Sequence, residues 1–597
     1  MKHVLFVLFF LLAFVKMQGQ EILKTNEQVT GFRSIPKEQV FVHFNSSVVL
    51  TGEYFYYKLY CFKEQKKKLS DISKVAYVEL VSEEGNQVFE HKIFLENGQG
   101  NGDVFIPTTV PSGSYKLLAY TRWMRNGSIK NFFQSAITII NPYQTDQTGI
   151  QKKQLTVVDS VSNDTIINKL NTPVKDLKMD SNIGPIQLSV GNEDFKKRSE
   201  VSVTLNGKNS QARINGNYSV SVRKKDGIKG VLPPKSNNFL ELNDNEIVGY
   251  TQGKGEEVYL PELRGELFHG QVKAIDNSSS VKNLRIAVSI PVEDSYFDVV
   301  TTNSSGIFYF NVNEAYSGDQ MFVQVLSNGA EKYDIILKKD NQVDYAKLVF
   351  EEVFIDPALK NEILQRSIHN QIENSYFQFR PDSVQSKLKS RISDNKERKV
   401  YILEDFTRFK TVRETIVEII KNVSTQSIGK DDFVIKVKGF DYATPSEVLP
   451  LILLDGSIVQ NHNAFLEYDA RNIKDITVMR HELIFGPKIF LGVLIINTNN
   501  GNSYETVSEI NSTSAIPIFK PQSDKNYFVQ TYQEDAATSR LPDDRLQLLW
   551  QPKLRLDSDM VEINFFTSDV SGEYEIQIEG FSDDNLPVSI RKSIFVD

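Results

Sequence analysis

The side chains that most often carry chemistry in proteins are not arranged for it in this sequence. No two of its seven histidines have the spacing with which one helix presents two zinc ligands. No G-x-S-x-G motif surrounds a serine, and residues 249–254 (GYTQGK) are one residue short of a phosphate-binding loop and lack its final Ser or Thr. Asp557 and Asp559 alternate as calcium ligands can, but their loop lacks further oxygen ligands. We therefore predict a protein that is not an enzyme, has no small-molecule substrate and needs no metal or other cofactor.

The charge and the cysteine content argue against two classes of protein, those that bind nucleic acid and those stabilised by disulfides. The net charge of −8 is spread along the chain and forms no basic face, so we expect no nucleic acid partner. Cys61 is the one cysteine and cannot form a disulfide within the chain, which argues against a disulfide-stapled scaffold. It lies in an alternating segment, where we expect a small buried side chain.

The first 19 residues predict export. A short basic start at Met1 to His3 precedes an apolar run over residues 4–15 and then a small residue, Gly19. This is the pattern of a secretory signal peptide, whose apolar run is too short for a stable membrane span. No later run reaches eighteen apolar residues. We expect a periplasmic protein that contacts the outer membrane only through a partner.

The secondary structure of the rest of the chain is predicted to be mostly strands. Short runs alternate apolar and polar residues and end at Gly, Asn, Asp and Ser, which is typical of antiparallel sandwiches. We therefore predict a mainly β chain of tandem β-sandwiches plus one small α+β domain. The expected order is a sandwich over 20–144, a polar linker over 145–185, and sandwiches over 186–258, 259–350 and 506–597. A helical connector over 351–405 and an α+β domain over 406–505 lie between the last two sandwiches.

All four predicted sandwiches carry segments that resemble known families. Gly52, Glu53 and Lys58 match G-E-x-x-x-x-K, residues 113–121 match G-x-Y-x-L-x-A-Y-T, and the domain resembles the MG2 domain of bacterial alpha-2-macroglobulin-like proteins. The segments 212–222 and 565–580 resemble strands of the same family, but its reactive thioester cysteine motif is absent, which excludes covalent trapping of proteases. Residues 301–310, with Gly306, Phe308 and Phe310, resemble the carboxypeptidase-regulatory-like domain, a transthyretin-like sandwich without catalytic residues.

The segment 449–501 predicts strand, turn, strand, helix, strand and a return strand with glycines. It resembles the plug domain of TonB-dependent receptors at 454–456 (LDG), 473–479, 485–486 and 492–496 (GVLII). An amphipathic helix expected over 406–423 precedes it. In those receptors the plug fills a barrel of the same chain. The residues after Gly501 would form no more than about six to eight membrane strands, so we expect a plug-like domain without a barrel of its own.

The turns of the plug-like domain are the candidate partner-binding residues. An apolar loop tip is costly unless something covers it, so the loop 485–492 is expected either to meet a partner or to fold inward. A metal shared by His462 and His481 is a weaker possibility than exposed histidines. The candidate residues are Asp455, Gly456, Asn461, His462, Asn463, Phe485, Gly486, Pro487, Phe490 and Gly492.

These features favour a non-enzymatic accessory protein of the outer membrane. Its plug-like domain would close or dock onto a β-barrel supplied by another chain, and the type 9 secretion channel of Bacteroidetes is a candidate because that phylum uses this order of domains. The alternative is a macroglobulin-like periplasmic or surface protein that binds peptides or proteases without a covalent bond. A further small α+β domain used as a spacer, and a hydrolase with an unrecognised site, remain open.

Overall fold

The computed structural model describes most of the chain. The described residues are 21–22, 26–63, 68–150, 184–208, 214–241, 257–276, 278–291, 296–326, 329–385, 398–439, 448–501, 503–511, 515–532, 540–557 and 560–597. The predicted signal peptide, most of the predicted linker, residues 249–254 and Asp559 lie outside them. Two compact units are formed by segments that alternate along the chain, and each is described by itself. Unit 1 contains residues 1–21, 264–342 and 386–523, and unit 2 contains residues 22–263, 343–385 and 524–597.

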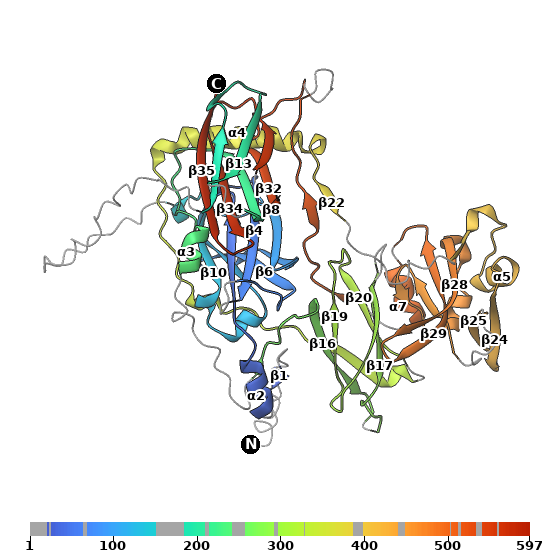
Figure 1. The fold of residues 1–597 in the computed structure, drawn as a ribbon. Helices are drawn as coiled ribbons and strands as arrows, with labels where there is room; N and C mark the ends of the chain where they lie inside the picture. Colours follow the sequence, from blue (N-terminus) through green and yellow to red (C-terminus); the bar gives the residue numbers. More distant parts are fainter. Residues whose placement is uncertain are drawn as a thin grey trace. The chain divides into compact units, whose positions relative to one another are not determined.

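The first sandwich of unit 2 has the expected antiparallel strands (Figure 1). One sheet has the order β3-β10-β9-β6-β7, in which only β3 and β10 are parallel. In the other, β4 pairs with β2, β5 and β8. Both faces of β4 are buried, since Phe55 and Tyr57 face the sandwich core while Tyr60 packs on Phe581 of the next sandwich. The strands are β2 (Glu38–Phe44), β3 (Val48–Leu50), β4 (Tyr54–Lys63), β5 (Lys68–Leu69), β6 (Val75–Ser82), β7 (Gln87–Phe94), β8 (Gln99–Phe105), β9 (Gly113–Tyr120) and β10 (Phe133–Ile140).

The second sandwich of unit 2 is built from two distant parts of the sequence. Its sheets have the orders β11-β13-β33 and β12-β35-β34-β14-β32. The two sandwiches expected over 186–258 and 506–597 are therefore one, because strands from the first region pair with strands from the second. Its strands are β11 (Ile186–Val190), β12 (Asp194–Phe195), β13 (Glu200–Gly207), β14 (Gly216–Lys224), β32 (Gln547–Leu556), β33 (Met560–Phe566), β34 (Gly572–Ser582) and β35 (Pro587–Val596).

Helices and short strands complete unit 2. The connector forms a helix where its apolar spacing predicts one, α4 (Lys360–Ser375), and this helix runs crosswise to the strands of the unit (Figure 1). The connector, predicted to be helical, also contains a short strand, β22, which pairs with β31. The remaining elements are α2 (Asn26–Arg33), α3 (Ser236–Glu241), β15 (Glu257–Val258), β22 (Ser383–Gln385) and β31 (Asp524–Asn526).

Unit 1 begins with a small sandwich over the predicted third β domain. Its sheets have the orders β19-β16-β21 and β18-β17-β20-β30. Phe308 and Phe310 are buried in its core, and Gly306 has a φ of 75°, as the expected turn requires. The strands are β16 (Glu266–Ala274), β17 (Arg285–Ile290), β18 (Tyr296–Thr301), β19 (Ile307–Val312), β20 (Gln320–Val325), β21 (Tyr333–Leu337) and β30 (Ile516–Pro517).

The α+β domain of unit 1 has the expected order of elements. Its sheet is β23-β28-β29-β26-β27, with a separate hairpin of β24 and β25. The helix expected over 406–423 is shorter, because Thr411 caps the first turn of α5 in a capping box with Glu414. The elements are β23 (Lys399–Ile402), α5 (Val412–Glu418), β24 (Val423–Gly429), β25 (Asp432–Val437), β26 (Leu451–Leu454), β27 (Ser457–Ile458), α6 (His462–Leu466), β28 (Ile473–Phe485), β29 (Lys488–Thr498) and α7 (Tyr504–Asn511).

The structure confirms the predicted fold class: a mainly β chain with β-sandwiches and one small α+β domain. Cys61 is buried in the core of the first sandwich. Among the described residues, no helix combines the length and the apolar content needed to cross a bilayer.

Candidate functional site

The predicted turns of the α+β domain hold that domain together. The Asp455 carboxylate accepts hydrogen bonds from the Thr498 backbone N–H at 2.7 Å and from the Thr498 hydroxyl at 2.6 Å. Asp455 and Gly456 have φ values of 45° and 84°, which are typical of a tight hairpin turn. These two residues thus fix the β26–β27 turn to the end of β29.

Residues 461–463 also form hydrogen bonds that hold the α+β domain together. The Asn461 side chain caps α6 by accepting from the Ala464 N–H, and the Asn463 side chain accepts from the Phe433 N–H at 2.8 Å. His462 Nδ1 accepts from the Ile435 N–H at 3.0 Å, and burial followed by the charge of Lys436 lowers the pKa of His462 to about 4. The described residues contain no group of three or more His, Cys, Asp or Glu side chains placed to hold a metal.

The loop between β28 and β29 has two different faces. Phe485 and Phe490 are only 5% and 4% exposed, and both pack on Phe297 of β18, with ring centroids 4.9 Å and 6.0 Å away. The chain itself therefore covers this apolar tip. Gly486 has a φ of 48° and contacts the backbone of Val299 so closely that a Cβ would lie 2.1 Å from the Val299 carbonyl oxygen.

Two residues that sequence analysis missed occupy the other face of this loop. Ile484 pairs with Ile489 across the hairpin, and both point away from Phe485 because side chains alternate along a strand. They are 70% and 48% exposed. Of the predicted loop residues, Pro487 is exposed beside them. Residues 483–485 are three consecutive apolar residues, which place an apolar side chain on each face of a strand, and this could have identified the outward pair.

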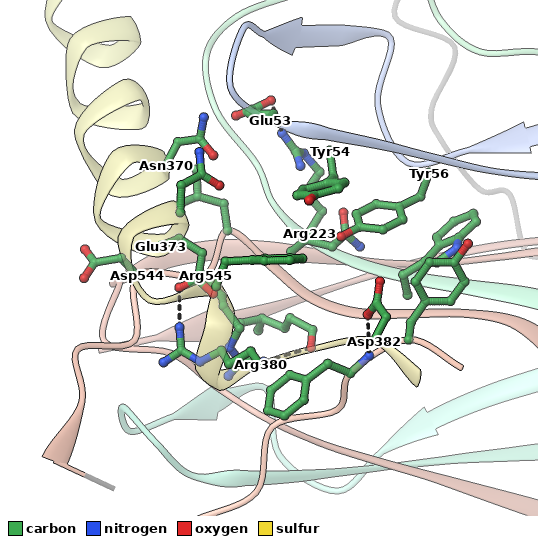
Figure 2. A pocket seen from close by; sticks show the side chains of 18 residues that line it. Glu53, Tyr54, Tyr56, Arg223, Asn370, Glu373, Arg380, Asp382, Asp544 and Arg545 are labelled. Carbon is green, nitrogen blue, oxygen red and sulfur yellow. Dashed lines mark hydrogen bonds and ion pairs between the residues drawn. The ribbon is translucent and has the colours of Figure 1, made fainter. Parts of the chain in front are cut away.

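Unit 2 contains a cavity of about 120 Å³ that sequence analysis did not predict. It lies where the first sandwich, the second sandwich and α4 meet, and Figure 2 shows side chains from all three around it. The lining residues come from segments far apart in sequence, and local sequence patterns cannot predict contacts between such segments. They are Glu53, Tyr54, Tyr56, Arg223, Asn370, Glu373, Asn374, Phe377, Arg380, Asp382, Tyr527, Phe528, Asp544, Arg545, Leu546, Gln547, Leu548 and Trp550.

Aromatic rings form much of the cavity wall. Tyr54 stacks on Phe377 with centroids 5.4 Å apart, and Tyr56 stacks on Trp550 at 5.8 Å. Tyr527 meets Tyr56 edge-on at 5.4 Å. Tyr54 and Tyr56 lie on the same face of β4, since they are two residues apart. The wall thus offers aromatic faces from both sandwiches and from the chain after α4.

A buried ion-pair network anchors α4 at the cavity. Arg366 of α4 donates to both carboxylate oxygens of Glu53, at 2.7 Å and 2.6 Å, and to Asp226 at 2.6 Å. Arg223 of β14 donates to Glu53 at 3.0 Å. Burial alone would raise the pKa of Glu53, but the charges of Arg366 and Arg223 outweigh it and lower the pKa to about 2. Glu53, identified in sequence as part of a family motif, therefore connects three elements.

The acids at the other end of the cavity are less well compensated. Glu373 pairs with Arg380 at 2.5 Å, and Asp382 accepts from the Phe528 N–H at 3.0 Å (Figure 2). Burial raises the pKa of both carboxyl groups, although Arg380 opposes the effect at Glu373 and the Phe528 N–H and Lys525 oppose it at Asp382.

Comparisons with known proteins give only distant likenesses. No protein-family model matches the sequence, and no curated protein matches it. Among solved structures, a mutant of Salmonella alpha-2-macroglobulin is 10% identical with a TM-score of 0.23, covering 94% of this chain and 39% of that one. Native Escherichia coli alpha-2-macroglobulin is 9% identical with a TM-score of 0.23, covering 98% and 41%. The Escherichia coli adhesin FdeC is 12% identical with a TM-score of 0.14, covering 50% and 64%.

This chain spans about two fifths of the length of the two macroglobulins. At these TM-scores the likeness does not extend to the arrangement of the whole molecule, and no activity, substrate or partner follows from it.

Proposed function

We propose that the chain is a non-enzymatic docking protein whose α+β domain binds a β-barrel supplied by another chain. The observation that carries the proposal is the outward pair of Ile484 and Ile489 at the tip of the β28–β29 hairpin. Two isoleucines side by side on an exposed hairpin favour burial against a partner, because each contributes apolar surface that water solvates poorly.

A second exposed apolar pair lies in the same domain. Val400 and Ile402 are about half exposed, at 47% and 50%, on β23, an edge strand of the sheet. Exposed apolar edge strands usually gain a covering chain or partner. The proposal places the protein at the periplasmic side of the outer membrane. A barrel too wide to fill its own interior, such as a type 9 secretion channel, would need a separate closing part of this kind.

The test is a pull-down of the tagged full chain from detergent-solubilised envelopes, with the retained proteins identified by mass spectrometry. We expect one large β-barrel in near-equal amount, and its loss from a variant carrying Ile484→Asp and Ile489→Asp. The matched control is Val417→Asp, which places a charge on α5 at a residue that is 66% exposed. If the wild-type chain retains no barrel, the proposal is wrong.

A second function, non-covalent binding of peptides, is favoured by the aromatic-walled cavity of unit 2. Cavities that bind ligands combine apolar walls with a few polar groups, as this one does. Trp550 lines the cavity, so a tryptic digest of casein added to the protein should change its tryptophan fluorescence. Unchanged fluorescence together with no heat in calorimetry would exclude this function.

A further inference from the structure

One carboxylate in the cavity of unit 2 lacks a close cationic partner. Asp382 uses Oδ1 to accept from the Phe528 N–H, while its Oδ2 lies 3.9 Å from Lys525 Nζ, beyond hydrogen-bond reach. Lys525 instead donates to Asp103 at 2.9 Å. Figure 2 shows the Asp382 carboxylate directed toward the Tyr56 side of the cavity. A half-buried carboxylate in this position favours a cation, and the raised pKa of Asp382 is consistent with that.

The charges around the cavity also favour a cation. Leaving aside His369, the charged lining residues and their ion-pair partners comprise seven carboxylates and five cationic groups. Arg380 and Arg545 are engaged by Glu373 and Asp543, each within 2.7 Å, which leaves little for a bound anion. The acids are Glu53, Asp103, Asp226, Glu373, Asp382, Asp543 and Asp544, and the bases are Arg223, Arg366, Arg380, Lys525 and Arg545.

The aromatic walls supply a second attraction for the same kind of group. The faces of tyrosine and tryptophan rings carry negative quadrupole charge and attract ammonium and guanidinium ions. Tyr54 and Tyr56 both lie on the cavity, and the apolar stem of a long basic side chain packs well on such rings. A free inorganic cation has no apolar stem and would gain nothing from that packing.

Two lining residues carry hydrogen-bond donors without acceptors. Trp550 is 4% exposed, and its Nε1–H has no acceptor among the residues that the structure describes. The same holds for Asn370 Nδ2 within the described part of the chain. Buried donors are nearly always satisfied in folded proteins, and a ligand that brings carbonyl oxygens would satisfy these two. A peptide backbone provides such oxygens.

We propose that the cavity binds one lysine or arginine side chain of a peptide, with the cation at Asp382 and the stem on Tyr54 and Tyr56. A cavity of about 120 Å³ suits one side chain, since a cavity of about 150 Å³ takes up a benzene molecule. This inference rests on the proposed peptide binding and adds which residue of the peptide is recognised.

The test is calorimetric titration of the full chain with two capped tripeptides, acetyl-Ala-Lys-Ala-amide and acetyl-Ala-norleucine-Ala-amide. They differ only in the ammonium group. We expect the lysine peptide to bind at least about tenfold more tightly, a difference of about 1.4 kcal/mol. Asp382→Asn should remove this preference. Asp557→Asn, the same change at an exposed acid of unit 2, should leave it intact.

Further titrations separate the possible outcomes. Trp550→Phe keeps an aromatic ring, although a smaller one, but removes the N–H and should weaken binding of the lysine peptide. 1,5-Diaminopentane, which has ammonium groups but no carbonyl, should bind more weakly than the peptide, and equal binding would overturn the assignment to a peptide. Equal binding of both peptides would overturn the basic-residue inference and leave peptide binding standing. If neither peptide binds, both proposals fail.

Discussion

The carboxylate of Glu53 accepts hydrogen bonds from Arg366 of α4 and Arg223 of β14 while it lies at the start of β4. All three side chains are nearly buried. Charges removed from water cost free energy unless each is matched by a close opposite charge. The position of α4 on the two sandwiches of unit 2 therefore depends on one acid, and Gly52 beside it accepts from Asn374 of the same helix at 2.8 Å.

Glu53→Gln should destabilise unit 2 by about 3–5 kcal/mol, because it leaves two buried guanidinium groups without their shared counter-charge. The measurement is urea unfolding followed by tryptophan fluorescence. Trp123 and Trp550, the only tryptophans of the sequence, both belong to unit 2, so the signal reports this unit alone.

Asp583→Asn is the matched control for this variant. It breaks a pair with Arg555 whose side chains are 42% and 48% exposed, and such surface pairs contribute about 1 kcal/mol or less. Equal shifts in the unfolding midpoints of the two variants would contradict the role assigned to Glu53.

Two buried histidines should make unit 2 sensitive to mild acid. Burial, reinforced by Arg591 at His43 and by Lys525 at His91, lowers their pKa values to about 3 and about 4. The unfolded chain takes up protons at these residues below its ordinary pKa of about 6.5, whereas the folded unit does not. Stability should therefore be complete above about pH 6.5 and fall as the pH drops toward 4.

Urea midpoints from tryptophan fluorescence at about pH 7.5 and about pH 5 test this prediction. Glu53 adds a separate loss at lower pH, between about 4.5 and 2, because its folded pKa lies below its unfolded one. An unchanged midpoint between the two higher pH values would show that the histidines titrate alike in both states.

At the scale of elements, neighbouring residues of the β28–β29 hairpin alternate between a buried face and an exposed face. Phe485→Ala removes a ring buried on Phe297 and should cost about 3–5 kcal/mol, while Ile484→Ala, one residue away, should cost much less. Hydrogen exchange of peptides covering 473–498, read by mass spectrometry, measures the difference. Similar loss of protection in both variants would contradict the assignment of the two faces.

Gly486 makes a close backbone contact between this hairpin and β18. Its φ of 48° suits glycine, and a Cβ would lie 2.1 Å from the Val299 carbonyl oxygen. Gly486→Ala should therefore increase hydrogen exchange in both the hairpin and β18. Gly501→Ala is the control, since Gly501 has a φ of 68° but no atom within 4 Å of the place that a Cβ would occupy. Equal increases in hydrogen exchange in the two variants would show that the positive φ, and not the contact with Val299, causes the loss of stability.

At the scale of the molecule, the second sandwich of unit 2 can form only when the segments 186–224 and 547–596 are both present. β13 pairs with β33, and β14 lies between β32 and β34. Residues 1–523 and 524–597 produced as two polypeptides in one cell should therefore bind each other. A tag on 524–597 should retain 1–523, and Val203→Asp, a charge in the shared core, should prevent it. Exposed Ser189→Asp on β11 is the control.

Sequence patterns predicted the local parts well. Alternation indicated the strands, and the segment 449–501 has the predicted order of elements because each step there depends on neighbouring residues. The helix predicted over 406–423 is longer than α5, because apolar periodicity does not show that Thr411 caps the helix. The joining of 186–224 with 547–596, and the cavity at Glu53 and Trp550, depend on contacts between distant segments that no local pattern encodes.

The joined sandwich also sets an order of events during synthesis. Glu193 and Lys592, which form an ion pair, are 399 residues apart in sequence, and loops of this length close slowly. The growing chain must carry β11 to β14 with unpaired edges while residues 264–342 and 386–523 of unit 1 are made. Such edges readily pair with the wrong strand, so this is the stage at which a chaperone is most needed. That exposure can end only when the ten residues of β35, which pair with β12 and β34, become available.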